Sequence, residues 1–356
     1  MTDWLIYPET QAALRRAAPR GVAVRIWLWS LAGLVFALVV VGGATRLTES
    51  GLSITEWKPV LGVIPPLSHA DWVAEFERYK QIPQYRELFP DMDLTRFQYI
   101  YFWEWTHRLI GRLLGLAIVL PLVGFWIAGR LSPGLKAALV GLVALVGLQG
   151  FVGWWMVSSG LSARVEVAQE RLAIHLLLAS CTLAWLVWLA TGQGARRRVA
   201  AGGGLRVFAG ALVVLILLQI GLGGLVAGLR AGLTYNTWPL MDGRLIPPLE
   251  HLTNLSPWWS NLLDNITTVQ FVHRMTAYAV VLAILAYAAA AFRTSDLAGY
   301  RGAVLLMLAL TQVVIGIATL VLVVPIHVAL CHQAFAMVLL GATVWNRRLL
   351  VRDGLV

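Results

Sequence analysis

Eight apolar stretches constrain this 356-residue chain more than any other feature. Each is roughly 20 residues long, the length of helix that crosses a hydrocarbon core about 30 Å thick. Inside a bilayer no water satisfies free backbone groups, so each stretch is predicted to be a helix. Only 13% of the residues are charged, too few for a soluble chain of this size. The sequence therefore predicts an all-α polytopic membrane protein that spans a lipid bilayer. The expected spans are 25–45, 104–128, 136–158, 172–191, 206–228, 268–291, 301–323 and 327–346.

The formal net charge of +10 is unevenly divided between the two sides of the membrane. The segments before the first span, after the second, fourth and sixth, and at the C-terminus carry fifteen basic and four acidic residues. The opposite connections carry ten basic and thirteen acidic residues. This positive-inside pattern predicts that both termini are cytoplasmic, and it gives no reason to expect nucleic acid as a partner. The leader resembles neither a cleavable signal nor a mitochondrial presequence, which favours a bacterial inner membrane.

The chain also contains an internal repeat of two four-helix halves, predicted at 1–191 and 206–356. A basic, glycine-rich linker over 192–205 joins them on the cytoplasmic side. Each half has an even number of spans, so the halves share an orientation and are expected to be related by a pseudo-twofold axis along the membrane normal. The repeated features are Gly42-Gly43 with Gly223-Gly224, Gly51-Leu52 with Gly232-Leu233, Trp57 with Trp238, His107-Arg108 with His273-Arg274, Gln149…Gly153 with Gln312…Gly316, and His175 with His332.

Four histidines lie about one turn inside four of the spans. They are His107 and His175 in the first half, and His273 and His332 in the second. Their helices all run from outside to inside, so the four side chains are expected to share the outer third of the bilayer. Neutral imidazoles that are paired in low-dielectric surroundings predict two bis-histidine haem sites, one in each half.

Other metals fit this pattern less well. Zinc and copper sites usually add cysteine or carboxylate ligands, and a di-iron bundle needs several glutamates. Here the one nearby acid is Glu104. His69 and His251 are interpreted as solvated loop residues. His327 lies about 140° around the helix from His332, so it is interpreted as a residue at the lip of the site.

Glu104 breaks the symmetry of the repeat. It stands three residues before His107, on the same helical face, and its equivalent in the second half is Gln270. A carboxylate at this depth is costly unless it has a function or a partner. We therefore expect a reactive site in the first half and a passive electron-carrying site in the second, or alternatively a carboxylate paired with an arginine. Arg108 and Arg274 could bind haem propionates or extend to the lipid headgroups.

The long outer loop over 46–103 is predicted to contain a helix near 69–81 with Ser68 as its N-cap. This helix has an apolar stripe that suits the bilayer surface or a cap over a site. The stripe consists of Trp72, Phe76 and Tyr79.

These residues resemble the haem A synthase family over nearly the whole chain. Some members of that family carry a cysteine pair in an outer loop, which this chain lacks. It is therefore most similar to the subgroup found in proteobacteria and mitochondria. The motifs that carry the resemblance are the segment 42–59, Pro65-Pro66-Leu67, Glu104-Trp105-Thr106-His107-Arg108, Phe271-Val272-His273-Arg274 and Cys331-His332-Gln333.

The resemblance implies oxidation of the C8 methyl group of haem O to a formyl group by successive hydroxylations, which gives haem A for cytochrome oxidase. It implies haem O as the substrate between His107 and His175. It also implies a permanent haem b, which relays electrons, between His273 and His332. Glu104 is then the expected catalytic residue. A haem O synthase is the implied partner, while the electron donor, the oxygen source and any homo-oligomer stay open.

Two other classes of protein remain as alternatives. A di-haem membrane cytochrome that exchanges electrons with quinone would have the same histidines, although it would not need the difference between Glu104 and Gln270. A transporter of haem or another small molecule would usually show broken helices and polar residues at the midplane. Here the key polar residues gather near one face.

Overall fold

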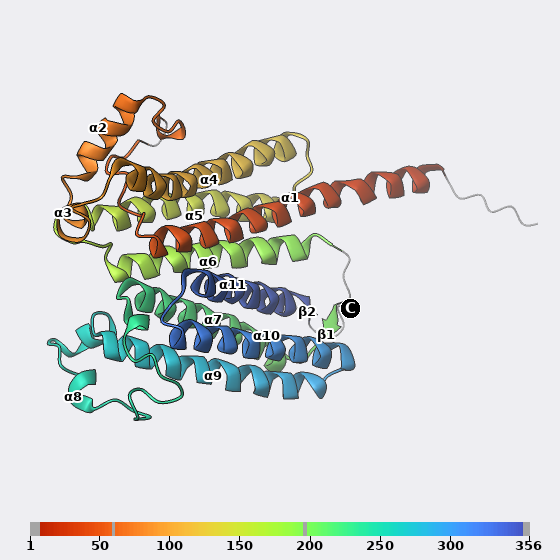
Figure 1. The fold of residues 1–356 in the computed structure, drawn as a ribbon. Coiled ribbons are helices and arrows are strands. Elements are labelled where there is room, and N and C mark those ends of the chain that lie inside the picture. The colour runs from red at the N-terminus through yellow and green to blue at the C-terminus, as the bar shows by residue number, and fades with distance from the viewer. Residues whose placement is uncertain (1–7, 59–60, 195–197, 352–356) are drawn as a thin grey trace, which may run out of the picture.

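The protein is described by a computed structural model over residues 8–58, 61–194 and 198–351. Within these residues, eight helices are long and apolar enough to cross a membrane, which confirms the predicted fold class (Figure 1). They are α1 (Pro8–Leu47), α4 (Leu94–Ile127), α5 (Pro133–Ser158), α6 (Gln169–Gly192), α7 (Gly203–Gly228), α9 (Ile266–Phe292), α10 (Asp296–Val321) and α11 (Ile326–Leu349). The shorter elements are η1 (Leu61–Val63), α2 (His69–Tyr79), α3 (Pro83–Leu88), η2 (Ala231–Leu233), α8 (Leu249–Leu252), η3 (Trp258–Leu262) and the strands β1 (Val199–Ala200) and β2 (Leu350–Val351).

The bundle has two distinct ends. We call the end that carries α2, α3 and α8 the loop end, and the end that carries β1 and β2 the strand end (Figure 1). The N-terminal part of α1 extends beyond the other helices at the strand end.

The spanning helices begin earlier than hydrophobicity alone predicts, and at two of them we follow the capping residue that sets the start. The Asp93 side chain accepts a hydrogen bond from the Arg96 backbone N–H at 2.8 Å, so α4 begins at Leu94 rather than near residue 104. Ser295 caps α10 in the same way and starts it at Asp296 rather than near residue 301. As a result, α4 projects well beyond its apolar stretch at the loop end.

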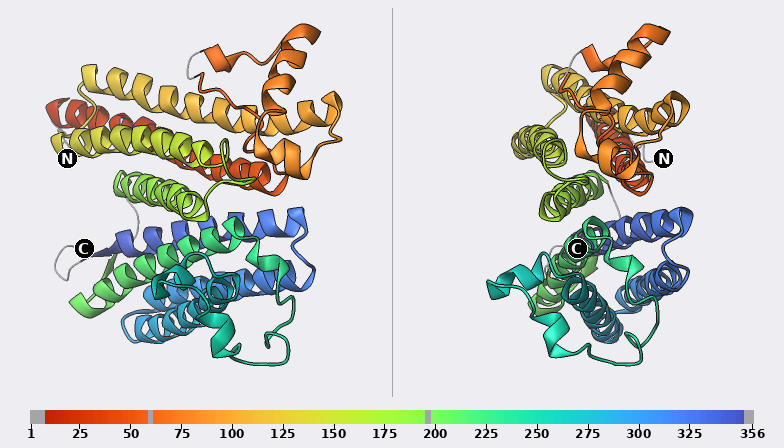
Figure 2. Two further views of the ribbon diagram at one scale, coloured as in Figure 1. Left: turned by 90° about the vertical axis from the view of Figure 1, so that its left-hand side faces the viewer. Right: turned by 60° about the vertical axis from the view of Figure 1, so that its left-hand side comes forward.

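The long helices form two four-helix groups that follow the sequence repeat (Figure 2). The first group is α1, α4, α5 and α6, and the second is α7, α9, α10 and α11. Between the groups, α6 packs against α7 and α11, and α1 packs against α11. In the repeat, α1 corresponds to α7 and α6 corresponds to α11. The contact of α6 with α7 therefore matches that of α1 with α11, as a twofold axis requires. The Gln333 side chain adds a polar link between the groups, donating from Nε2 to the Val39 carbonyl at 2.8 Å.

The linker between the halves contains an element that the sequence did not predict. Its strand β1 pairs in parallel with β2, with Val199 opposite Leu350 and Ala200 opposite Val351. The linker is therefore tied to the C-terminal end of α11. Residues 195–197 of the predicted linker lie outside the described residues.

The predicted loop helix is present as α2, and it begins with a complete capping box. Ser68 Oγ accepts from the Asp71 N–H at 3.1 Å, while Asp71 accepts from the Ser68 N–H at 3.1 Å. Its apolar stripe does not lie on a bilayer surface, because Phe76 and Tyr79 are buried against Phe97 of α4. The stripe thus attaches α2 to the projecting end of α4.

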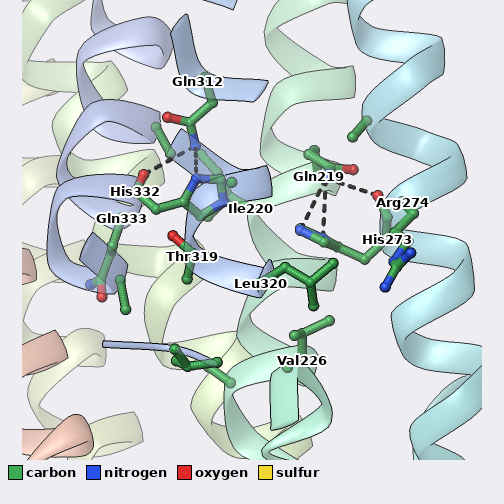
Figure 3. A pocket seen from close by; sticks show the side chains of 18 of the residues that line it. Gln219, Ile220, Val226, His273, Arg274, Gln312, Thr319, Leu320, His332 and Gln333 are labelled. Atoms are coloured by element: carbon green, nitrogen blue, oxygen red, sulfur yellow. Dashed lines mark hydrogen bonds between the residues drawn. The ribbon is translucent and has the colours of Figure 1, made fainter. Parts of the chain in front are cut away.

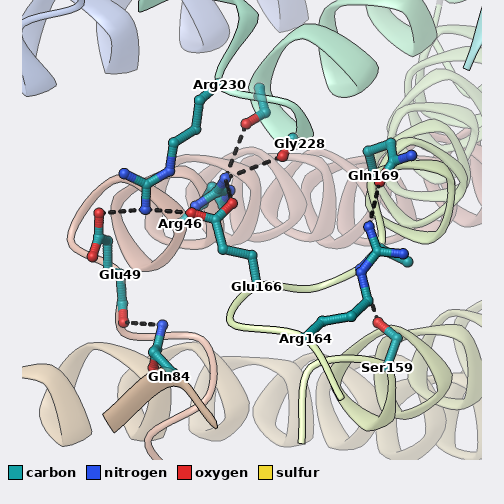
Figure 4. Close-up of polar contacts among 11 residues, drawn as sticks. Arg46, Glu49, Gln84, Ser159, Arg164, Glu166, Gln169, Gly228 and Arg230 are labelled. Carbon is teal, nitrogen blue, oxygen red and sulfur yellow. Dashed lines mark hydrogen bonds and ion pairs between the residues drawn. The ribbon is translucent and has the colours of Figure 1, made fainter. Parts of the chain in front are cut away.

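An ion cluster joins the two halves at the loop end (Figure 4). It consists of Arg46 at the end of α1, Glu49 just after it, Glu166 in the α5–α6 loop, and Arg230 just after α7; we call it the interhalf cluster. Glu166 binds both arginines, at 2.5 Å from Arg46, and Arg230 also binds Glu49 at 2.5 Å. Burial lowers the pKa of Arg230, but Glu166 and Glu49 raise it, and the net effect is a rise. Glu49 and Arg230 occupy equivalent positions in the two repeats, and they carry opposite charges that pair with each other.

Candidate functional site

Each of the four predicted histidines packs its imidazole ring against a glycine on a neighbouring helix. A Cβ atom built on that glycine would lie 2.7–3.3 Å from the histidine Cε1, which is closer than ordinary van der Waals contact. We call these glycines the seats, because only a residue without a side chain lets the ring approach so closely. The pairs are His107 on Gly42, His175 on Gly153, His273 on Gly223 and His332 on Gly316.

Three of the four histidines are also held by a glutamine, which stands four residues before the seat on the same helix. In each case the glutamine Nε2 donates to the backbone carbonyl of the histidine at 3.0 Å. The same Nε2 lies 3.1 Å from His273 Nδ1, 3.2 Å from His332 Nδ1 and 3.5 Å from His175 Nε2. We call this arrangement the glutamine clamp. Its members are Gln149 for His175, Gln219 for His273 and Gln312 for His332.

Sequence reasoning found the spacing of Gln149 and Gln312 but assigned it no role, and it missed Gln219. The signal that could have found Gln219 is the recurrence of glutamine four residues before a repeated glycine. The clamp joins two different helices, so a single-sequence pattern could not show the contact itself.

The second half contains a cavity of about 450 Å³ between its two histidines (Figure 3). His273 from α9 and His332 from α11 face it from opposite sides, and most of its lining is apolar. This volume falls within the range of about 300–1,000 Å³ that is common for small-molecule and cofactor sites. Arg46, Glu49 and Arg230 of the interhalf cluster line the same cavity.

This cavity fits a flat apolar ring that is ligated on both faces. Two imidazoles supply nitrogen ligands, as haem iron prefers. Buried polar atoms without a partner also remain beside it, namely Arg274 Nε and the amide oxygens of Gln219 and Gln312. An amide oxygen can accept the N–H of a neutral imidazole whose other nitrogen binds iron, and Arg274 Nε can donate to a carboxylate.

The first half brings His107 and His175 together as electrostatic neighbours. The Nδ1 atoms of both rings are buried without a hydrogen-bond partner. These two side chains are therefore available as a second pair of ligands. Their seats come from α1 and α5, the repeat equivalents of the two helices that seat the histidines of the second half.

Glu104 is buried, and its carboxylate is fully engaged. It accepts from Ser53 Oγ and from the Ile54 N–H, both at 2.8 Å, and it pairs with Arg108 at 2.5 Å. The carboxylate therefore ties α4 to the segment that follows α1. The predicted alternative of a pairing with an arginine is present in the structure, and Arg108 is the partner.

Gln270 occupies the matching place in the second half. Its Nε2 donates to the Ala231 carbonyl at 2.8 Å and to the Thr234 carbonyl at 3.1 Å, so it ties α9 to the segment that follows α7. Thr234 is the repeat equivalent of Ser53. Both positions therefore perform the same tethering, and they differ mainly in that only Glu104 carries a negative charge.

Arg108 and Arg274, which directly follow His107 and His273, anchor the same segments. Arg108 donates to the Ile54 carbonyl at 3.0 Å, and Arg274 donates to the Tyr235 carbonyl at 2.6 Å. Tyr235 is the repeat equivalent of Ile54. Arg274 also lines the second-half cavity with its Nε unpartnered, and the predicted contact of either arginine with a propionate or a headgroup stays a prediction.

The other histidines lie outside the paired positions. His69 and His251 are exposed, the first at the start of α2 and the second in α8, as the sequence predicts for loop residues. His327 is also exposed at the start of α11, while His332 lines the cavity.

A bundle of two repeated four-helix halves, each with a pair of glycine-seated histidines, defines an internally repeated, polytopic membrane protein. Residues 25–344 match the COX15-CtaA family, which is described as cytochrome oxidase assembly protein, and the chain belongs to that family. It is 60% identical over 336 residues to a protein of Beijerinckia indica subsp. indica named heme A synthase, covering 92% of this chain and 93% of the relative. Proteins of Brucella ovis and Brucella abortus with the same name are 51% identical over 327 residues, which is 91% of each chain.

Proposed function

We propose that the protein is a haem A synthase, a membrane oxidoreductase that converts a methyl group of haem O into the formyl group of haem A. The family, the names of the relatives and the two histidine pairs support this proposal. The single observation that carries it is the difference between the two sites. At equivalent tethering positions the first half has the carboxylate of Glu104 and the second has the neutral amide of Gln270.

In this proposal the first half receives haem O as the substrate, between His107 and His175. The second half holds a resident haem b between His273 and His332, within the cavity of about 450 Å³. When bound there, haem b supplies one-electron transfer. Gln219 and Gln312 orient its histidine ligands, and the apolar lining excludes water from the ring.

The reaction explains why two different sites are needed. Converting a methyl group into a formyl group removes four electrons from that carbon and adds one oxygen atom, through an alcohol stage. With water as the balancing species, four protons are also released. An electron carrier in the neighbouring half and a proton-accepting group beside the substrate are therefore both required. The second half provides the first of these, and Glu104 provides the second.

The hydrogen bonds of Glu104 orient its two carboxylate oxygens. One carboxylate oxygen faces Ser53 and Ile54, and the other faces Arg108. A proton on the Arg108 side reaches the segment after α1 at the loop end, where Arg108 also contacts the Ile54 and Glu56 carbonyls. The negative charge would equally stabilise positive charge on the carbon being oxidised.

The experiment that tests this proposal combines pigment extraction with a matched pair of charge variants. Purified wild-type protein should yield haem b together with haem O or haem A. Glu104→Gln should keep the haem content, because Gln270 shows that an amide can serve as the tether. It should reduce haem A formation by about 10²-fold or more, the usual loss when a proton-transferring group is removed.

Glu77→Gln serves as the control, since it removes an exposed carboxylate of α2 that pairs with Lys80, outside both sites. We expect haem A formation to stay close to the wild-type rate in that variant. Undiminished haem A output from Glu104→Gln would remove Glu104 from the chemistry. Extraction of haem b alone, with no haem O or haem A in any preparation, would instead favour the di-haem cytochrome.

We further propose that the loop end faces the periplasm of a bacterial inner membrane and that both termini are cytoplasmic. The positive-inside charge bias supports this orientation, and topology reporters fused to either terminus test it. A membrane enzyme that makes haem O is the expected source of substrate. A separate redox partner is expected to serve haem b: it accepts the four electrons if water supplies the oxygen atom, and it donates electrons if dioxygen is the oxidant.

A further inference from the structure

The glutamine clamp is present at three of the four predicted iron ligands and absent at the fourth. On α1, the position four residues before the seat Gly42 is occupied by Leu38. The repeat offset that aligns Gly42 with Gly223 aligns Leu38 with Gln219. The exception falls in the first half, which also carries Glu104.

His107 is consequently held differently from the other three histidines. Its ring hydrogen-bonds to the backbone carbonyl of Leu38 rather than to a glutamine side chain, and its Nδ1, like that of His175, is buried without a hydrogen-bond partner. One turn away, Thr45 Oγ1 donates to the Trp103 carbonyl of α4 at 3.3 Å, and it shares that proton with the Val41 carbonyl at 2.9 Å. The clamps, by contrast, bind the ligand-bearing turn itself at 3.0 Å.

A partner of this kind matters for how firmly a ligand binds its metal. Groups that orient a ligating histidine typically change metal affinity by 10–100-fold when they are removed. A substrate haem must leave both of its axial ligands after each turnover, whereas a resident haem must keep both of its own. An enzyme that holds both kinds of haem therefore needs at least one histidine that dissociates more readily from the substrate haem.

We propose that Leu38 makes His107 the exchangeable ligand of the substrate haem. Gln149, Gln219 and Gln312 are the matching positioning residues, and they keep the other three histidines in place. This inference rests on the proposed function, because it takes the first half as the substrate site. It adds to that function a specific order of release, in which the bond to His107 breaks before the bond to His175.

The test installs the missing clamp and measures how fast each haem leaves. Purified full-length protein in detergent is mixed with excess apomyoglobin as a haem acceptor, and the pigment left on the protein is extracted and identified over time. Leu38→Gln should slow the loss of haem O and haem A at least tenfold relative to the wild type. Leu38→Met, which is similar in size and has no amide, should stay within twofold of the wild type.

A mirror variant tests the same idea in the second half. Gln219→Met removes the clamp from His273, so haem b should leave at least tenfold faster. The electron paramagnetic resonance signal of the low-spin haem b should also broaden or shift, because the ring of His273 is no longer oriented. This measurement does not need Leu38→Gln to fold, and it does not depend on turnover.

Two results would overturn the inference, and they can be told apart. If Leu38→Gln and Leu38→Met lose haem O and haem A at the same rate, or if Gln219→Met holds haem b as the wild type does, the clamp does not control exchange. In that case the proposed function stands, provided that His107→Ala still loses the haem O and haem A of the first half. If His107→Ala keeps both pigments at the wild-type level, the first half is not the substrate site, and the proposed function falls together with the inference.

Discussion

Each of the four histidine rings can occupy its position only because the glycine beside it has no Cβ atom. A Cβ atom at position 316 would lie 2.7 Å from His332 Cε1, whereas one at position 223 would lie 3.3 Å from His273 Cε1. Gly316→Ala should therefore displace its ring more than Gly223→Ala does, although in the proposed function both substitutions act on the same haem. We expect Gly316→Ala to lower the haem b content of purified protein several-fold and Gly223→Ala to lower it less, as measured by the pyridine haemochrome assay. Gly147→Ala is the control, because nothing lies within 4 Å of its added Cβ. Equal haem content in all three variants would show that the seats are not needed.

At the same scale, the sequence indicated candidate site residues but not their contacts. The four histidines and Glu104 could be found because they recur, or fail to recur, at fixed positions in two halves. The engagement of Glu104 by Ser53 and Ile54 could not be found, because it joins α4 to a loop about fifty residues earlier in the chain. Leu38 was passed over because an apolar residue in a membrane helix looks ordinary until its three equivalents are seen to be glutamines.

At the scale of elements, the stability of the first turn of α2 should depend on pH. The Ser68 hydroxyl and backbone N–H lower the pKa of Asp71 below its ordinary value of 3.8. Because the folded-state pKa is depressed, this contribution to stability is complete above the ordinary value and is lost as the pH falls through the lowered one. The first turn of α2 should therefore exchange its amide hydrogens faster at pH 3 than at pH 5, after correction for intrinsic rates. Ser68→Ala should exchange fast at both values. A first turn that is equally protected at pH 3 and pH 5 in the wild type would contradict this expectation.

The elements that the sequence predicted are those with a strong local signal. All eight spans follow from length and hydrophobicity, and α2 follows from its cap and its periodic stripe. The pairing of β1 with β2 involves two residues in each strand, far too few for a periodic pattern. The early start of α4 was missed because Asp93 and the polar first turns lie outside the apolar run that defined the span. Burial of the α2 stripe depends on that projecting end, so its direction could not be predicted either.

For the whole molecule, the sequence repeat predicted two halves but not what holds them together. The interhalf cluster joins Glu49 to Arg230 across 181 residues. The two residues are repeat equivalents with opposite charges. This arrangement favours the pairing of a first half with a second half, because two copies of either half would bring like charges together. The cluster also lines the second-half cavity, so the contact between the halves and one of the two ring sites share the same side chains.

Exchanging the two charges tests whether the cluster joins the halves. Glu49→Arg leaves three arginines around Glu166, and Arg230→Glu leaves three carboxylates around Arg46, so each reversal should lower the thermal unfolding temperature in detergent. The double exchange restores the contact between positions 49 and 230 but not the one between 166 and 230, so recovery should be partial. The coupling free energy between the two substitutions should be about 0.5–3 kcal/mol, the range typical of residues in contact.

The controls for this exchange concern the backbone and the charge. Both positions have positive φ angles, 59° and 51°, so backbone strain is similar in every variant. Glu49→Gln controls for loss of charge without reversal. If the effects of the two reversals simply add in the double variant, Glu49 and Arg230 contribute nothing as a pair to holding the halves together.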